Sequence, residues 1–144
     1  MIRLLVVEGH PGVRRGLEMW FRLAPDITVV AEAGDSLSAL WQAAMNRPDV
    51  VLMHLHDADL GDDKLIPALR RAAPGSKIVI LSLYDDARTR RRLLAAGAAA
   101  FVSMHDGKEQ LLRAIRRAAG HSEAESGSDY SSPPPTSLKT SREL

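Results

Sequence analysis

Short apolar runs alternate along the chain with longer segments in which apolar residues recur every three or four positions. The apolar runs lie within residues 2–7, 27–31, 50–53, 77–82 and 95–104. Runs of this length, bounded by turn residues, are typical of strands that are buried on both faces. The segments between them have the periodicity of helices that cover a sheet. The alternation predicts an α/β fold, a doubly wound, five-stranded parallel sheet with five helices.

The helix boundaries follow from capping residues, proline and glycine. The expected helices run from Pro11 to about Leu23, from Asp35 or Ser36 through Asn46, over about 63–73, from Asp85 or Asp86 to Gly97, and from Asp106 onward. Leu37, Leu40, Trp41 and Ala44 form the apolar stripe of the second helix, and Trp20 lies on that of the first. We therefore expect both tryptophans to lie in the core.

The most informative residue is His54, which ends the apolar run 50–53. In an open parallel sheet, ligands and chemistry collect just beyond the carboxyl ends of the strands. The residues that end or follow the other strands belong to the same edge: Glu8 and Gly9 after the first, Ser82 at the end of the fourth, and Met104 after the fifth. These five residues form the candidate pocket.

The segments together resemble the receiver domain of a bacterial response regulator of the NarL/FixJ type, from about residue 1 to residue 120. The resemblance implies the flavodoxin-like receiver fold and a phosphorylation pocket at this edge. Such receivers usually have two adjacent acids that hold magnesium, a phosphoryl-accepting aspartate, a Ser or Thr, and a lysine. This chain has Glu8-Gly9, His54, Ser82 and Met104 at those positions, so only the hydroxyl matches fully. Phe101 takes the place of the family's switch aromatic, where we expect core packing.

Aspartyl phosphorylation needs a carboxylate nucleophile and a divalent cation that neutralises charge on the phosphoryl group. With Gly9, His54 and Met104 in the pocket, we expect neither phosphorylation nor tight magnesium binding, and we expect no catalytic residue and no cofactor. The main hypothesis is an atypical receiver that serves as a phosphorylation-independent dimerisation or regulatory module of a transcription regulator, and not an enzyme. The alternative is a ligand-gated receiver that binds a small metabolite in the altered pocket.

A metal site is a weaker alternative. His10, His54, His56 and His105 all follow strand ends at the same edge, and imidazole suits zinc, copper or nickel. Their spacing is not that of a tight ligand set, and loop histidines that face water are the ordinary interpretation.

Basic residues gather in the fourth and fifth helices, where most should be solvated. In related receivers the fourth helix, fifth strand and fifth helix form a dimer or output surface, so the resemblance implies a homodimer. It marks Arg88, Arg91, Arg92, Lys108 and Arg113 as candidate contact residues, and the first and fifth helices are another candidate surface.

Composition limits the remaining classes. The chain has 144 residues, no cysteine and a net charge of +1, so it has no disulfide framework and too little positive charge for the domain itself to favour nucleic acid. No run is long enough for a membrane helix and no leader is visible, so we expect a cytoplasmic protein. Residues 121–136 read as a disordered linker rich in Ser and Pro. Residues 137–144 resemble the opening of a LuxR-type helix-turn-helix domain, through which alone DNA would be bound.

Overall fold

The computed structural model describes residues 1–55 and 62–120, and five strands alternate there with five α-helices. The elements are β1 Ile2–Val7, α1 Pro11–Arg22, β2 Ile27–Ala33, α2 Ser36–Asn46, β3 Val50–Leu55, α3 Asp62–Ala72, β4 Lys77–Ser82, α4 Ala87–Ala96, β5 Ala100–Ser103, the 3-10 turn η1 Met104–Asp106 and α5 Lys108–Ala118. The expected linker 121–136 and the segment 137–144 lie outside the described residues.

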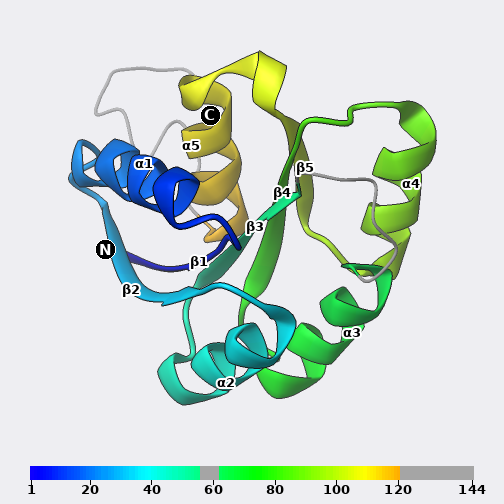
Figure 1. Cartoon of the computed structure of the whole chain (residues 1–144), viewed down its shortest axis with the longest axis horizontal. Coiled ribbons are helices and arrows are strands. Elements are labelled where there is room, and N and C mark those ends of the chain that lie inside the picture. The colour runs from blue at the N-terminus through cyan, green and yellow to red at the C-terminus, as the bar shows by residue number, and fades with distance from the viewer. Residues whose placement is uncertain (56–61, 121–144) are drawn as a thin grey trace, which may run out of the picture.

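All strand pairs are parallel, and the sheet order is β2-β1-β3-β4-β5. Helices α1 and α5 cover one face of the sheet, and α2, α3 and α4 cover the other (Figure 1). The predicted doubly wound, five-stranded parallel fold is therefore confirmed. Its strand order reverses between β1 and β3, which is where the carboxyl ends of such strands leave room for chemistry.

Alternating strand residues build two separate cores. In β3, Val50 and Leu52 join the core under α1 and α5, whereas Val51 and Met53 join the core under α2, α3 and α4. This division follows from the two-residue repeat of a strand, which sends successive side chains to opposite faces. Position 54 has the parity of Leu52, so its side chain belongs to the α1/α5 side.

Most predicted helix ends are found in the structure. Asp35 caps α2 by accepting a hydrogen bond from the Ser38 amide at 2.7 Å, and Asp86 caps α4. The fifth helix is the exception. Asp106 does not open it, because its carboxylate accepts from the Ser103 amide and closes the short turn η1. The helix starts after Gly107, whose φ of +88° suits a residue without a Cβ.

The expected burial of both tryptophans is wrong. The two large residues expected on the stripe of α2, Leu37 and Trp41, are 80% and 64% exposed, and Trp20 of α1 is 38% exposed. Ala39 and Ala43 face the sheet instead. Trp41 is two residues from both alanines, about 200° around the helix, so it faces outward when they face the sheet.

Within the two described ranges, no helix has the length and apolar character needed to cross a bilayer.

Candidate functional site

His54 lies inside the third strand, not just beyond it as predicted. Strand β3 extends past the apolar run to Leu55, and His54 pairs with Leu81 of β4 while Leu55 pairs with Ser82. Glu8 directly follows β1, and its amide donates to the Ala33 carbonyl at 2.9 Å. The parallel ladder therefore brings the ends of β1, β3 and β4 to one edge of the sheet.

The centre of this edge is a buried contact between a carboxylate and an imidazole. Nδ1 of His54 contacts Oε1 of Glu8, and Nε2 of the same ring lies 2.8 Å from Sδ of Met104. Glu8 is 1% exposed and His54 is 7% exposed. A buried acid and a buried base in contact satisfy each other's hydrogen bonding, which an isolated group of either kind could not do.

Backbone groups hold Glu8 in position. Its second carboxylate oxygen, Oε2, accepts a hydrogen bond from the His10 amide at 2.8 Å. Its carbonyl accepts from Nη1 of Arg14 at 2.7 Å, and Nε of Arg14 also lies 3.1 Å from Glu32. These bonds fix the carboxylate toward the sheet and toward His54.

Gly9 leaves little room for a larger residue. A Cβ at this position would lie 3.3 Å from the carbonyl oxygen of Gly34, so any side chain there requires a small backbone adjustment. The acid that the resemblance expects beside Glu8 would have to meet this condition.

Ser82 and Phe101 have local contacts. Oγ of Ser82, which is buried, accepts from the Tyr84 amide at 2.9 Å. The ring of Phe101 packs in the core, and the guanidinium of Arg90 lies 5.0 Å from its centroid, a cation–π distance.

The other histidines that were considered as metal ligands have different environments. Nδ1 of His10 accepts from the Gly12 and Val13 amides at 3.1 and 3.3 Å, and thereby caps α1. His105 is an exposed residue of η1, and His56 lies outside the described residues. Across residues 1–55 and 62–120, no three His, Cys, Asp or Glu side chains are grouped as metal ligands.

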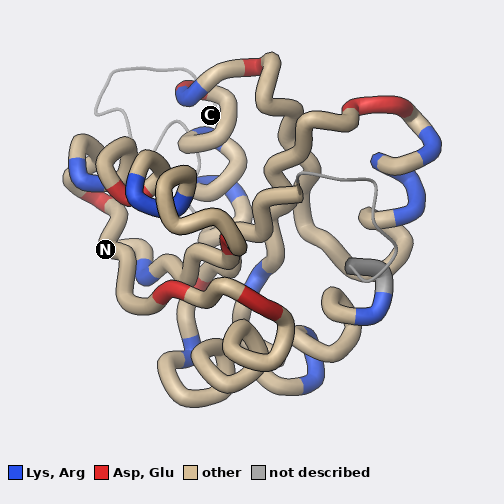
Figure 2. The backbone as a smooth tube through the Cα atoms, in the orientation of Figure 1, with Lys and Arg blue, Asp and Glu red and all other residues tan. Residues whose placement is uncertain are grey.

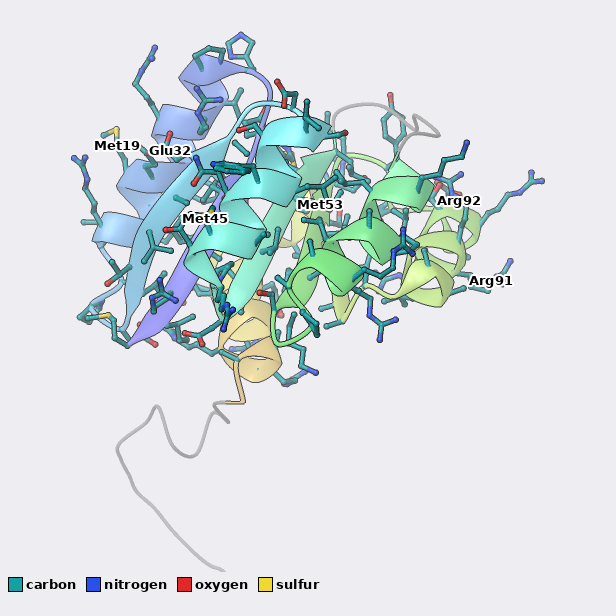
Figure 3. All side chains as sticks on the ribbon, turned by 90° about the horizontal axis from the view of Figure 1, so that it is seen from below. Met19, Glu32, Met45, Met53, Arg91 and Arg92 are labelled. Atoms are coloured by element: carbon teal, nitrogen blue, oxygen red, sulfur yellow. The ribbon has the colours of Figure 1, made fainter. Side chains whose placement is uncertain are left out.

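Basic residues lie on both α4 and α5, the two helices that contact the edge strand β5 from opposite faces of the sheet. Figure 3 shows Arg91 and Arg92 on α4 at the outer end of the row of helices formed by α2, α3 and α4. Beside them, a hollow of about 530 Å³ runs along β5. Its charged lining consists of Lys77, Arg90, Asp106, Arg113 and Arg117.

Two features at the carboxyl edge of the sheet were not predicted from the sequence. The contact of Met104 with His54 joins residues 50 positions apart, and the role of His10 as a helix cap depends on its ring orientation. The second could have been anticipated, because His10 precedes a proline at the first helical position, where a side-chain acceptor is favoured.

Comparison with known protein families shows which kind of domain this is. The family model for the response regulator receiver domain matches residues 4–116. The chain belongs to this family. Receiver domains of this family are regulatory parts of two-component systems.

Curated relatives agree with this assignment. The nitrate/nitrite response regulator protein NarP of Escherichia coli K12 is 35% identical over 117 residues, which are 81% of this chain and 54% of that protein. The response regulator GacA of Pseudomonas aeruginosa PAO1 is 32% identical over 81% of this chain and 55% of that protein. The chain thus spans about half the length of these relatives.

Solved structures share the fold. A two-component response regulator of the LuxR family from Aurantimonas sp. SI85-9A1 superposes with a TM-score of 0.74 at 26% identity, over 85% of this chain and 88% of that one. The signal receiver domain of NarL from Mycobacterium tuberculosis gives a TM-score of 0.74 at 24% identity, over 83% and 96%.

Proposed function

We propose that this receiver domain acts without aspartyl phosphorylation, as an interaction module that controls a transcription regulator. The observation that carries the proposal is the buried contact of Glu8, His54 and Met104 at the carboxyl edge of the sheet. An imidazole at position 54 cannot form an acyl phosphate. Without a lysine at 104, the pocket also lacks the cation that would bind a phosphoryl oxygen.

The same contact argues against magnesium in the pocket. Mg²⁺ prefers several oxygen ligands in a near-octahedral arrangement. Oε1 of Glu8 faces His54 and its Oε2 accepts from the His10 amide, so the carboxylate is directed into protein contacts. Releasing it for a metal would leave the imidazole without its buried acceptor.

A ligand-gated receiver is the second candidate for the same pocket. A metabolite would have to displace Met104, a half-buried residue of η1 that contacts His54. It would also have to replace the contacts that His54 loses. That cost is why we favour the interaction module. A metabolite that raises the melting temperature of the wild-type chain, but not of Met104→Phe, would favour the ligand-gated candidate instead.

The basic edge is a suitable surface for an acidic partner or output segment. Arg88 and Arg91 are exposed, while Arg92, Lys108 and Arg113 are partly buried. Two acids lie at the start of α4: Asp86 caps the helix and interacts electrostatically with Arg92, and Asp85 accepts from the Ser103 hydroxyl at 3.2 Å. The basic residues of this edge outnumber them. We propose that this surface contacts the rest of the regulator.

Acetyl phosphate labelling tests the proposal. We expect no label on the wild type and none on His54→Asp, because that single change restores neither the second acid nor the lysine. The triple variant Gly9→Asp, His54→Asp, Met104→Lys should be labelled once the backbone near Gly34 adjusts. Circular dichroism checks that each variant is folded.

An acid-labile, hydroxylamine-sensitive label on the wild-type chain would overturn the proposal. Efficient labelling of His54→Asp alone would show that Gly9 and Met104 do not block the chemistry, and would equally contradict this account of the pocket.

A further inference from the structure

Helix α2 differs from the other helices in its charge. Over its eleven residues it has no Asp, Glu, Lys or Arg, whereas each of the other four α-helices in the described ranges has at least three such residues. Figure 2 shows the tube of α2 without a charged position, while blue segments mark α1, α3, α4 and α5. Solvent-facing helices normally have a charged outer face.

The outer face of α2 is apolar. Leu37, Trp41 and Met45 are spaced by four residues, so they form one stripe along the helix, and they are 80%, 64% and 63% exposed. The side facing the sheet has the small residues Ala39 and Ala43, which are fully buried. The helix thus turns its small apolar residues inward and its large ones outward, the reverse of what folding stability alone would select.

We infer that the stripe Leu37–Trp41–Met45 is the contact surface between two copies of this chain. The inference deepens the proposed interaction module by naming the surface through which it dimerises. At about 150 Å² of exposed area for each side chain, the three residues of the stripe offer roughly 450 Å² of apolar surface per copy. That is about half of the roughly 800 Å² that each partner buries in a standard interface. The remainder can come from the polar residues that rim the stripe, as is usual in interfaces.

The charges at the two ends of α2 favour a second copy in an antiparallel arrangement. Exposed Asp35 caps the N-terminus, and exposed Arg47 follows at the C-terminus. Both are six residues from Trp41. A twofold axis beside Trp41 therefore brings Trp41 against its own copy and Leu37 against Met45, and it places Asp35 at the same level along the helix axis as Arg47 of the second copy. Antiparallel helices also align their dipoles favourably.

The basic edge is less suited to self-association. In a twofold contact a patch meets its own copy, so a patch that is mainly of one charge brings like charges together. Pairing α4 with its own copy would place Arg88 and Arg91 near their counterparts, and like charges opposed in this way are unfavourable. Helix α2 has no such charges. We therefore assign the contact between copies to α2, and contact with other partners to the basic edge.

Sedimentation velocity of the full 144-residue chain across the micromolar range tests the inference. We expect a monomer–dimer equilibrium in the wild type. Trp41→Glu should raise the dissociation constant roughly tenfold or more, as loss of a central aromatic anchor does. Met19→Glu on α1 is the matched control, since Met19 is also 64% exposed, and it should leave the equilibrium unchanged.

Thiol cross-linking locates the contact directly, because the chain has no cysteine. Ala44→Cys places one thiol beside the stripe on exposed helix surface and keeps the three large side chains in place. A short bis-maleimide should capture it as a dimer. Ala95→Cys, an exposed alanine on α4, is the control and should remain uncrosslinked.

Three results would overturn the inference: a wild-type chain that stays monomeric both with and without beryllofluoride and magnesium, a dimer that Trp41→Glu leaves intact, or cross-linking of Ala95→Cys instead of Ala44→Cys. A monomeric wild type would assign the stripe to a different protein. A dimer that requires beryllofluoride and magnesium but is lost in Trp41→Glu would support the α2 contact and overturn the phosphorylation-independent function. The two proposals can therefore fail separately.

Discussion

The buried pair of Glu8 and His54 makes a quantitative prediction about stability. Replacing His54 with Leu removes the imidazole from the buried Glu8 carboxylate, which is 1% exposed. The His10 amide still donates a hydrogen bond to this carboxylate. Removing one partner of a buried ion pair typically costs about 3–5 kcal/mol. Because the His10 amide still donates to the carboxylate, we expect the lower end, about 3 kcal/mol at pH 8.

The reciprocal change should cost less. Glu8→Leu leaves an imidazole that keeps its contact with Met104. Removing one member of a buried hydrogen-bonded pair typically costs about 1–3 kcal/mol. The double variant removes both polar groups, and replacing both partners with apolar residues can be nearly neutral. We therefore expect it to be more stable than His54→Leu alone, with a coupling energy of about 2 kcal/mol or more.

The coupling energy distinguishes this explanation from simple loss of packing. Urea denaturation followed by far-ultraviolet circular dichroism measures all four proteins at pH 8. Additivity of the two changes within about 0.5 kcal/mol at pH 8 would refute the reasoning.

Two further predictions concern the scaffold. Arg116 of α5 donates to Asp26 through Nε and Nη2 at 2.8 and 3.0 Å, and these hydrogen bonds raise the pKa of Arg116. Because both side chains are partly exposed, Asp26→Asn should lower the free energy of unfolding by only about 1 kcal/mol, measured by urea denaturation. An unchanged midpoint would show that the pair contributes nothing. Hydrogen bonds from the Thr89 amide and hydroxyl lower the pKa of Asp86 below 3.8. Its contribution is therefore present above that value and lost as the pH falls through the lower folded-state pKa, so the melting temperatures of wild type and Asp86→Asn should converge in acid. A constant difference down to the lowest pH at which both fold would contradict this assignment.

The sequence alone determined the elements and their order. Strand runs such as residues 2–7 and 77–82 are recognisable because a strand buried on both faces needs consecutive apolar residues. Helix ends at Asp35, Asp86 and Gly97 are recognisable because a cap acts on amides or carbonyls only a few residues away. Both signals are local, so they can be read along the chain.

The tertiary structure decided the contacts within the pocket and the orientation of α2. Glu8, His54 and Met104 are separated by 46 and 50 positions, and only the order of the parallel strands brings them together. The stripe that includes Trp41 has the same spacing whether it faces the core or the solvent. Which side of a helix is buried depends on how closely it can approach the sheet, and Ala39 and Ala43 settle that for α2. Periodicity predicts that a helix has an apolar face, but the space left by its neighbours decides which face is covered.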